Sequence, residues 1–147
     1  MADTGGPVRQ SLMLTLTLQP GTIAVCRLAA EEPVPGWATQ GAFFSVTRTP
    51  EELSVVCPYA AVPEGVKREG PWACFKVEGP LDFALTGILA SLTAPLANDG
   101  ISVFALSTYD TDYLLVREDK RDAAAVSLLA AGSTCVNSPS PPGRGKG

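Results

Sequence analysis

The 147-residue chain contains no histidine, and this absence limits its chemistry. Histidine is the commonest general base and metal ligand in proteins, and it completes Ser-His-Asp and Cys-His catalytic arrangements. The sequence also has no metal-ligand spacing and no glycine-rich phosphate loop. We therefore expect a non-catalytic protein with no cofactor and no bound metal.

Charged residues are scarce, at 18% of the chain, and the net charge is −4. A nucleic-acid partner is not expected, because no basic stripe is present to displace the counterions of a nucleic acid. Membrane contact is not expected either, because no apolar run approaches the roughly 20 residues that a spanning helix needs. Residues 1–10 do not resemble a secretory signal, so we expect a cytoplasmic protein.

Cysteine occurs only four times, without the short spacings of metal sites or redox motifs. Each cysteine has an apolar neighbour, and free cysteine commonly behaves as a small buried hydrophobe. We therefore expect reduced, buried thiols, and a cysteine-based redox function has little support. The four residues are Cys26, Cys57, Cys74 and Cys135.

In the second half of the chain, segments with the apolar spacing of strands alternate with segments that have the apolar spacing of helices. The expected order is β-α-β-β-α-β, which packs as four antiparallel strands with two helices on one face. The expected strands are 73–78, 101–106, 113–116 and 133–137, and the expected helices begin near residue 83 and cover 118–131.

The first half has a similar hairpin but no convincing long first helix. Leucines alternate with other residues over 12–18, which predicts a strand, and residues 43–48 and 53–57 form a hairpin pattern. An offset of 60 positions (103 − 43) relates this hairpin to the later one. The aligned pairs are Phe43 with Val103, Val46 with Leu106, and Val56 with Val116.

These patterns predict an α+β protein built from two small modules, the first one degenerate. We expect a disordered leader over 1–11, a first module over 12–71, a second module over 72–137 and a disordered tail over 138–147. The tail is rich in proline, glycine and serine and has no apolar residue.

The stretch Asn98-Asp99-Gly100-Ile101, between the expected first helix and the next strand, is similar to that of an ACT domain. Longer motifs over 43–51, 94–97 and 101–118 resemble stand-alone tandem ACT proteins, a family that includes the cytosolic arginine sensors called CASTOR. The resemblance implies ferredoxin-like modules with antiparallel sheets. It also implies a free amino acid bound between ACT modules, and a homodimer that recreates the four-module sensor.

The resemblance also implies the residues of the site. The ligand carboxylate is expected at Ser102 and Val103, and its amino group at Asp112 in the following hairpin. Thr108 and Tyr109 occupy the remaining matching positions of that hairpin. Leu85 stands where the sensors have the acidic residue that reads the guanidinium, and Asp82 is the nearest acid.

From the residues alone, each of these positions also has a plain structural interpretation. Asp112 is equally suited to a turn, Ser102 to a strand, Tyr109 to an exposed loop and Asp82 to a helix cap. The alternative function is accordingly a structural or scaffolding ACT protein that binds no ligand.

Overall fold

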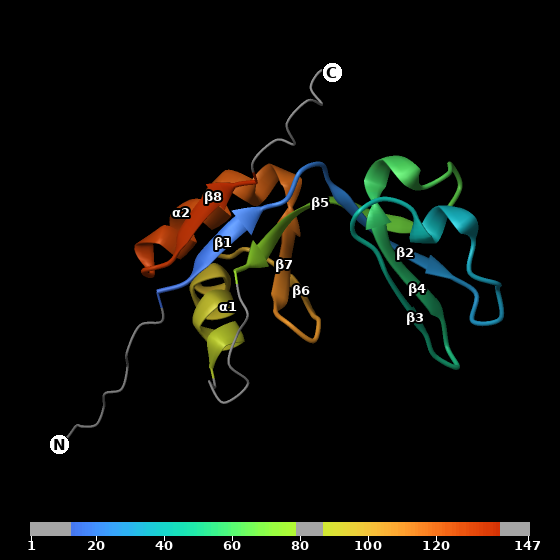
Figure 1. Ribbon diagram of the computed structural model, residues 1–147, viewed down its shortest axis with the longest axis horizontal. Helices are drawn as coiled ribbons and strands as arrows, with labels where there is room; N and C mark the ends of the chain where they lie inside the picture. The colour runs from blue at the N-terminus through green and yellow to red at the C-terminus, as the bar shows by residue number, and fades with distance from the viewer. Residues whose placement is uncertain (1–12, 79–86, 139–147) are drawn as a thin grey trace.

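The computed structural model describes residues 13–78 and 87–138, which form one eight-stranded sheet with two α-helices (Figure 1). The helices are α1(Ile88–Asn98) and α2(Arg121–Ala130), with single 3₁₀ turns η1(Gly36–Thr39), η2(Tyr59–Ala61) and η3(Glu118–Lys120). The strands are β1(Thr15–Leu18), β2(Ile23–Leu28), β3(Ser45–Arg48), β4(Leu53–Pro58), β5(Arg68–Val77), β6(Phe104–Ser107), β7(Asp112–Arg117) and β8(Thr134–Asn137).

The ten-residue strand β5 joins the two ends of the sheet. Its first residues pair with β2, and its later residues pair with β1 on the same edge and with β7 on the opposite edge. We call β2, β3, β4 and the start of β5 the N-terminal lobe. The remaining strands, the end of β5 and both α-helices form the C-terminal lobe, which lies on the left in Figure 1.

Strand β1 lies in the C-terminal lobe, although the sequence had placed residues 12–18 in the first module. It is inserted between β5 and β8, antiparallel to β5 and parallel to β8. The expected four-stranded antiparallel sheet is therefore wrong for this lobe, which has five strands and one parallel pair. Leu16 is fully buried and belongs to the core under the two helices, which explains the placement. The expected boundary after residue 71 falls inside β5, and the division into modules stays a prediction.

The β3–β4 and β6–β7 hairpins have the same register but are 59 positions apart, not 60. Ser45 pairs with Val56, and Phe104 pairs with Leu115, so each partner is displaced by 59 (104 − 45 and 115 − 56). The offset of 60 was therefore wrong. A shift of one residue moves every side chain of a strand to the other face of the sheet.

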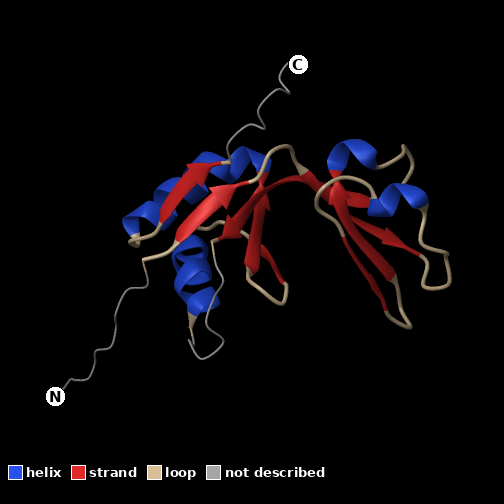
Figure 2. Ribbon diagram, in the orientation of Figure 1, coloured by secondary structure: helices blue, strands red, loops and turns tan. Residues whose placement is uncertain are grey.

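Both α-helices cover one face of the C-terminal lobe (Figure 2). On α1, Ile88, Leu92 and Leu96 are buried at helical spacing, as an apolar helix face requires. The expected start near residue 83 lies outside the described residues. The expected second helix begins as the turn η3 and becomes α-helical at Arg121. None of the helices that the structure describes is long and apolar enough to cross a membrane.

The opposite face of the sheet joins the lobes through aromatic side chains. The rings of Phe43 and Tyr113 lie 4.9 Å apart, and those of Trp72 and Phe104 lie 6.3 Å apart. Trp72 is buried, and its indole N–H donates to the Glu69 carbonyl at 3.1 Å. These aromatic contacts therefore join the two lobes beside β6 and β7.

All four cysteines are free thiols, three of them buried and Cys135 half-buried. Burial raises the pKa of the Cys74 thiol to about 12. Burial, with the nearby Cys26, raises the pKa of Cys57 to about 11. Little thiolate therefore forms at these positions at neutral pH.

Leu16→Ala tests the insertion of β1 into the C-terminal core. Because Leu16 is fully buried, the substitution should lower the free energy of unfolding by about 2–5 kcal/mol. Thr15→Ala, at an exposed position of the same strand, is the matched control and should change it by at most about 0.5 kcal/mol. Chemical denaturation of the two variants measures both changes in the free energy of unfolding. Equal, small effects would mean that β1 is not part of this core.

Candidate functional site

A groove of about 500 Å³ lies between the C-terminal half of α1 and the start of β6. Two of the residues that the sequence singled out, Ser102 and Val103, line it. Sequence reasoning missed the other lining residues, although Thr93 and Ala97 stand one helical turn apart on α1. Among the described residues, the groove is lined by Thr93, Ala97, Gly100, Ile101, Ser102, Val103 and Ala105.

The end of α1 shapes this groove. Gly100 has a φ of 76°, the left-handed conformation that glycine adopts without strain at the end of a helix. The Ile101 N–H then donates to the Leu96 carbonyl at 2.9 Å, and the Ile101 side chain is buried. The chain turns sharply there and leads through Ser102 into β6.

Ser102 and Val103 precede the hydrogen-bonded ladder of the hairpin. The register between β6 and β7 begins at Phe104 opposite Leu115, so the N–H groups of Ser102 and Val103 lie outside the described ladder. Ser102 is exposed and Val103 half-buried. Backbone N–H groups and a hydroxyl in this position are suited to a carboxylate.

The other candidate residues lie at the tip of the β6–β7 hairpin. The Ser107 hydroxyl donates to Asp112 Oδ1 at 2.6 Å, and the Thr108 N–H donates to the Thr111 carbonyl at 2.7 Å. Thr111 is buried, and its hydroxyl donates to the Val77 carbonyl at the end of β5. Tyr109 is 83% exposed at the tip. The hairpin therefore holds Asp112 in a defined position.

The two groups of candidate residues stand at opposite ends of β6. Val103 and Thr108 are five residues apart along an extended chain, which spans about 16 Å at 3.3 Å per residue. The carboxylate and ammonium of an amino acid are attached to the same carbon atom. One copy of the chain therefore does not bring both groups to one ligand. Asp82 and Leu85 lie outside the described residues.

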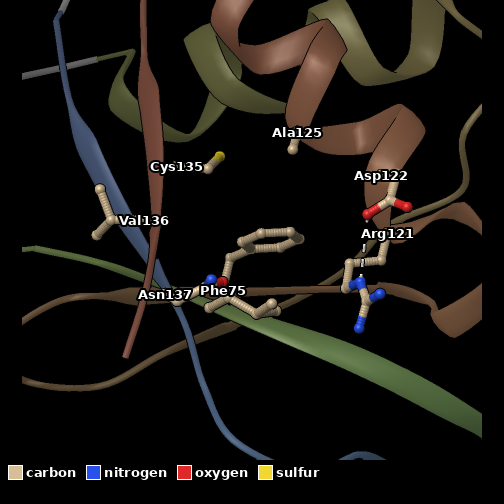
Figure 3. A pocket seen from close by; sticks show the side chains of 8 residues that line it. Phe75, Arg121, Asp122, Ala125, Cys135, Val136 and Asn137 are labelled. Carbon is tan, nitrogen blue, oxygen red and sulfur yellow. Dashed lines mark hydrogen bonds and ion pairs between the residues drawn. The ribbon is translucent and has the colours of Figure 1, made fainter. Parts of the chain in front are cut away.

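A second cavity, of about 320 Å³, lies between α2 and strands β1 and β8 (Figure 3). The Arg121 guanidinium on α2 is already engaged with two carboxylates, Glu118 at 3.2 Å and Asp122 at 3.4 Å. Burial raises the pKa of the Cys135 thiol, which points toward this cavity. None of the ligand-binding residues predicted from the sequence is among its described lining residues. The groove at β6 is the better candidate because it offers backbone N–H groups and hydroxyls.

Profiles of known families match both halves of the chain. The profile of the ACT domain matches residues 67–130, which include the groove, the hairpin and both α-helices. A second profile, for an N-terminal domain, matches residues 21–65. The boundary between the matches falls just before β5.

Two curated relatives share more than a third of their aligned residues with this chain. Putative protein CASTOR3P of Homo sapiens is 36% identical over 102 residues, which are 60% of this chain and 61% of that protein. Cytosolic arginine sensor for mTORC1 subunit 1 of Bos taurus is 37% identical over 91 residues, 52% of this chain and 26% of that protein. The matched region thus spans less than two thirds of either relative.

A solved structure covers nearly the whole chain. Protein Atu0741 from Agobacterium tumefaciens is 39% identical, with a TM-score of 0.82 over 88% of this chain and 96% of that one. Residues 67–130 of the chain form an ACT domain, and the chain is related to the CASTOR arginine sensors.

Proposed function

We propose that this chain is a non-catalytic regulatory protein that binds a free amino acid at an interface between ACT modules. The ACT domain over residues 67–130 and a relative named as an arginine sensor support an amino-acid-sensing role. The observation that carries the proposal is the separation of the two candidate half-sites at opposite ends of β6. Since that relative is named as cytosolic, we propose the same compartment for this chain.

Each lobe contributes one ACT module, and the two modules share β5. The N-terminal lobe has the strand order β3-β4-β2-β5, with the turns η1 and η2 in place of helices. The C-terminal lobe runs β5-α1-β6-β7-α2-β8, with β1 as an additional strand. The equal registers of their hairpins support this division.

A homodimer brings the half-sites together. Among the described strands, β6 pairs only with β7, which leaves its other edge for a partner. Edge strands invite pairing, and a two-fold axis makes two copies of one strand antiparallel. The start of β6 in one copy then lies beside the hairpin tip of the other, so Ser102 and Val103 face the Asp112 of the second copy.

Within this composite site each group has one role. The ligand carboxylate accepts hydrogen bonds from the N–H groups of Ser102 and Val103, and the ligand ammonium donates to Asp112. Asp112 already accepts one bond from Ser107 on Oδ1, which orients the carboxylate and leaves Oδ2 for the ligand. Thr108 and Tyr109 close the site from the hairpin, and Asp82 stays a candidate contact from the sequence.

The alternative is a structural or scaffolding ACT protein with no ligand. Isothermal titration against a panel of free amino acids separates the two functions. Saturable heat with any amino acid supports the proposal, and no heat from the whole panel supports the alternative.

Asp112→Asn keeps the shape of the side chain and removes the charge that receives the ammonium. Losing one partner of a desolvated charged hydrogen bond typically costs about 2–5 kcal/mol of binding. The affinity should therefore fall roughly thirty-fold or more in a titration with the amino acid that the panel identifies. The melting temperature should change little, because the amide oxygen of an asparagine can still accept the hydrogen bond that the Ser107 hydroxyl donates to Asp112.

Asp110→Asn is the matched control, since Asp110 is an exposed carboxylate on the same hairpin. It should bind the amino acid as the unmodified protein does. Equal affinities for the Asp112 and Asp110 variants would show that Asp112 is not the ammonium partner.

The dimer itself is tested with Ala105→Lys. Ala105 is exposed near the middle of β6, so the two-fold axis places the two new lysines opposite each other. Like charges in directly opposed strand positions are destabilising. The variant should therefore be a monomer in light scattering at protein concentrations of tens of micromolar. Ala90→Lys, at an exposed position of α1, should remain dimeric. An unmodified protein that scatters as a monomer, with and without amino acids, would contradict the proposed assembly.

A further inference from the structure

We infer that Thr111 is the residue that positions Asp112 for the ligand, through the hydrogen bond that the Thr111 hydroxyl donates to the Val77 carbonyl. This inference rests on the proposed function and adds to it a residue that sequence reasoning missed. Thr111 makes no contact with the ligand and acts only through Asp112.

The burial of Thr111 sets it apart from the rest of the hairpin tip. Thr111 is 6% exposed, whereas residues 107–110 are all exposed and Asp112 is half-buried. A buried hydroxyl costs free energy unless it is hydrogen-bonded, and the partner of this one is the Val77 carbonyl. The hydroxyl therefore holds the tip against the body of the sheet at one defined point.

This bond continues the attachment of β7 to β5 beyond their regular pairing. The register between the two strands ends at Lys76 opposite Tyr113. Val77 follows on β5, and a side-chain bond from Thr111 reaches it where the register stops. Asp112 lies between Thr111 and Tyr113, so the chain is held to β5 on both sides of it.

The two hairpins of the chain close their tips with the same backbone bond. The Thr49 N–H donates to the Glu52 carbonyl at 2.9 Å, and the Thr108 N–H donates to the Thr111 carbonyl at 2.7 Å. The positions agree with the offset of 59 between the hairpins (108 − 49 and 111 − 52). The tips can therefore be compared residue by residue.

The residue that follows the closing bond differs between the hairpins. Leu53 holds this position in the N-terminal lobe, is fully buried and packs in the core of that lobe, so its side chain anchors the hairpin. The corresponding residue in the C-terminal lobe is Asp112 (53 + 59), and burying a carboxylate in an apolar core is costly. Thr111 supplies the anchor that Asp112 cannot, and leaves the carboxylate accessible to an ammonium.

Thr111→Val removes the hydroxyl at similar side-chain volume, and Thr111→Ser retains the hydroxyl. The probe is the free amino acid, from a panel that includes arginine, that binds the unmodified protein most tightly in isothermal titration. Its affinity should fall roughly ten-fold or more in Thr111→Val, as it does when groups that orient a metal ligand are removed. It should be unchanged in Thr111→Ser. Each titration is carried out well below the melting temperature of the variant.

Ser127→Ala is the matched control for a loss of stability. Ser127 is also buried in the C-terminal lobe, and its hydroxyl donates to the Pro95 carbonyl at 3.2 Å. Both substitutions remove a buried hydroxyl that donates to a backbone carbonyl, so both should lower the melting temperature. Only Thr111→Val should weaken binding, and equal losses of affinity in the two variants would contradict a positioning role.

The remaining outcomes separate this inference from the proposed function. Unchanged affinity in folded Thr111→Val overturns the inference and leaves the proposed function standing. A loss in Thr111→Val without a loss in Asp112→Asn also overturns it, because Thr111 could not then act through Asp112. Thr111→Ala repeats the test if Thr111→Val does not fold, and the failure of both to fold would contradict a role confined to Asp112. If the unmodified protein binds no amino acid, the proposed function fails and the inference with it.

Discussion

The pairing of β5 along both of its edges is the constraint on which the rest of the structure depends. One edge holds β2 and then β1, and the other holds β7, so a single ten-residue strand fixes the positions of both lobes. Through β7 it also fixes the hairpin that carries Asp112. The buried Thr111 adds a second attachment, because its hydroxyl donates to the Val77 carbonyl at the end of β5.

The length of β6 decides how a ligand can be bound. Four residues of strand separate the groove at Ser102 and Val103 from the hairpin tip at Asp112. A rigid strand cannot bring its two ends to one small molecule, so in the proposed dimer the two half-sites of one chain serve two different ligands. Binding then depends on assembly, and an amino acid that bridges two copies stabilises the dimer over the monomer. Such coupling is the means by which the proposed regulatory protein would report ligand concentration.

Local patterns in the sequence predicted the elements of the C-terminal lobe, including both helices and the β6–β7 hairpin. They did not predict the place of β1, because its alternating leucines specify a strand with one apolar face but not its partners. The offset of 60 failed for a related reason: it matched apolar residues, whereas register follows from the hydrogen-bonded ladder. The spacing between Val103 and Asp112 was visible in the sequence, but the groove was not, since helix packing against β6 creates its walls.

Mixed dimers test most directly whether one ligand bridges two copies. Asp112→Asn disables the hairpin half-site, and Val103→Pro removes the N–H group of the other half-site. Each variant alone should bind the amino acid weakly or not at all. After the two are mixed and allowed to exchange subunits, half of the dimers carry one intact site, and about a quarter of the original binding capacity should return. A mixture in which mixed dimers form but binding does not return would contradict a site shared between two copies.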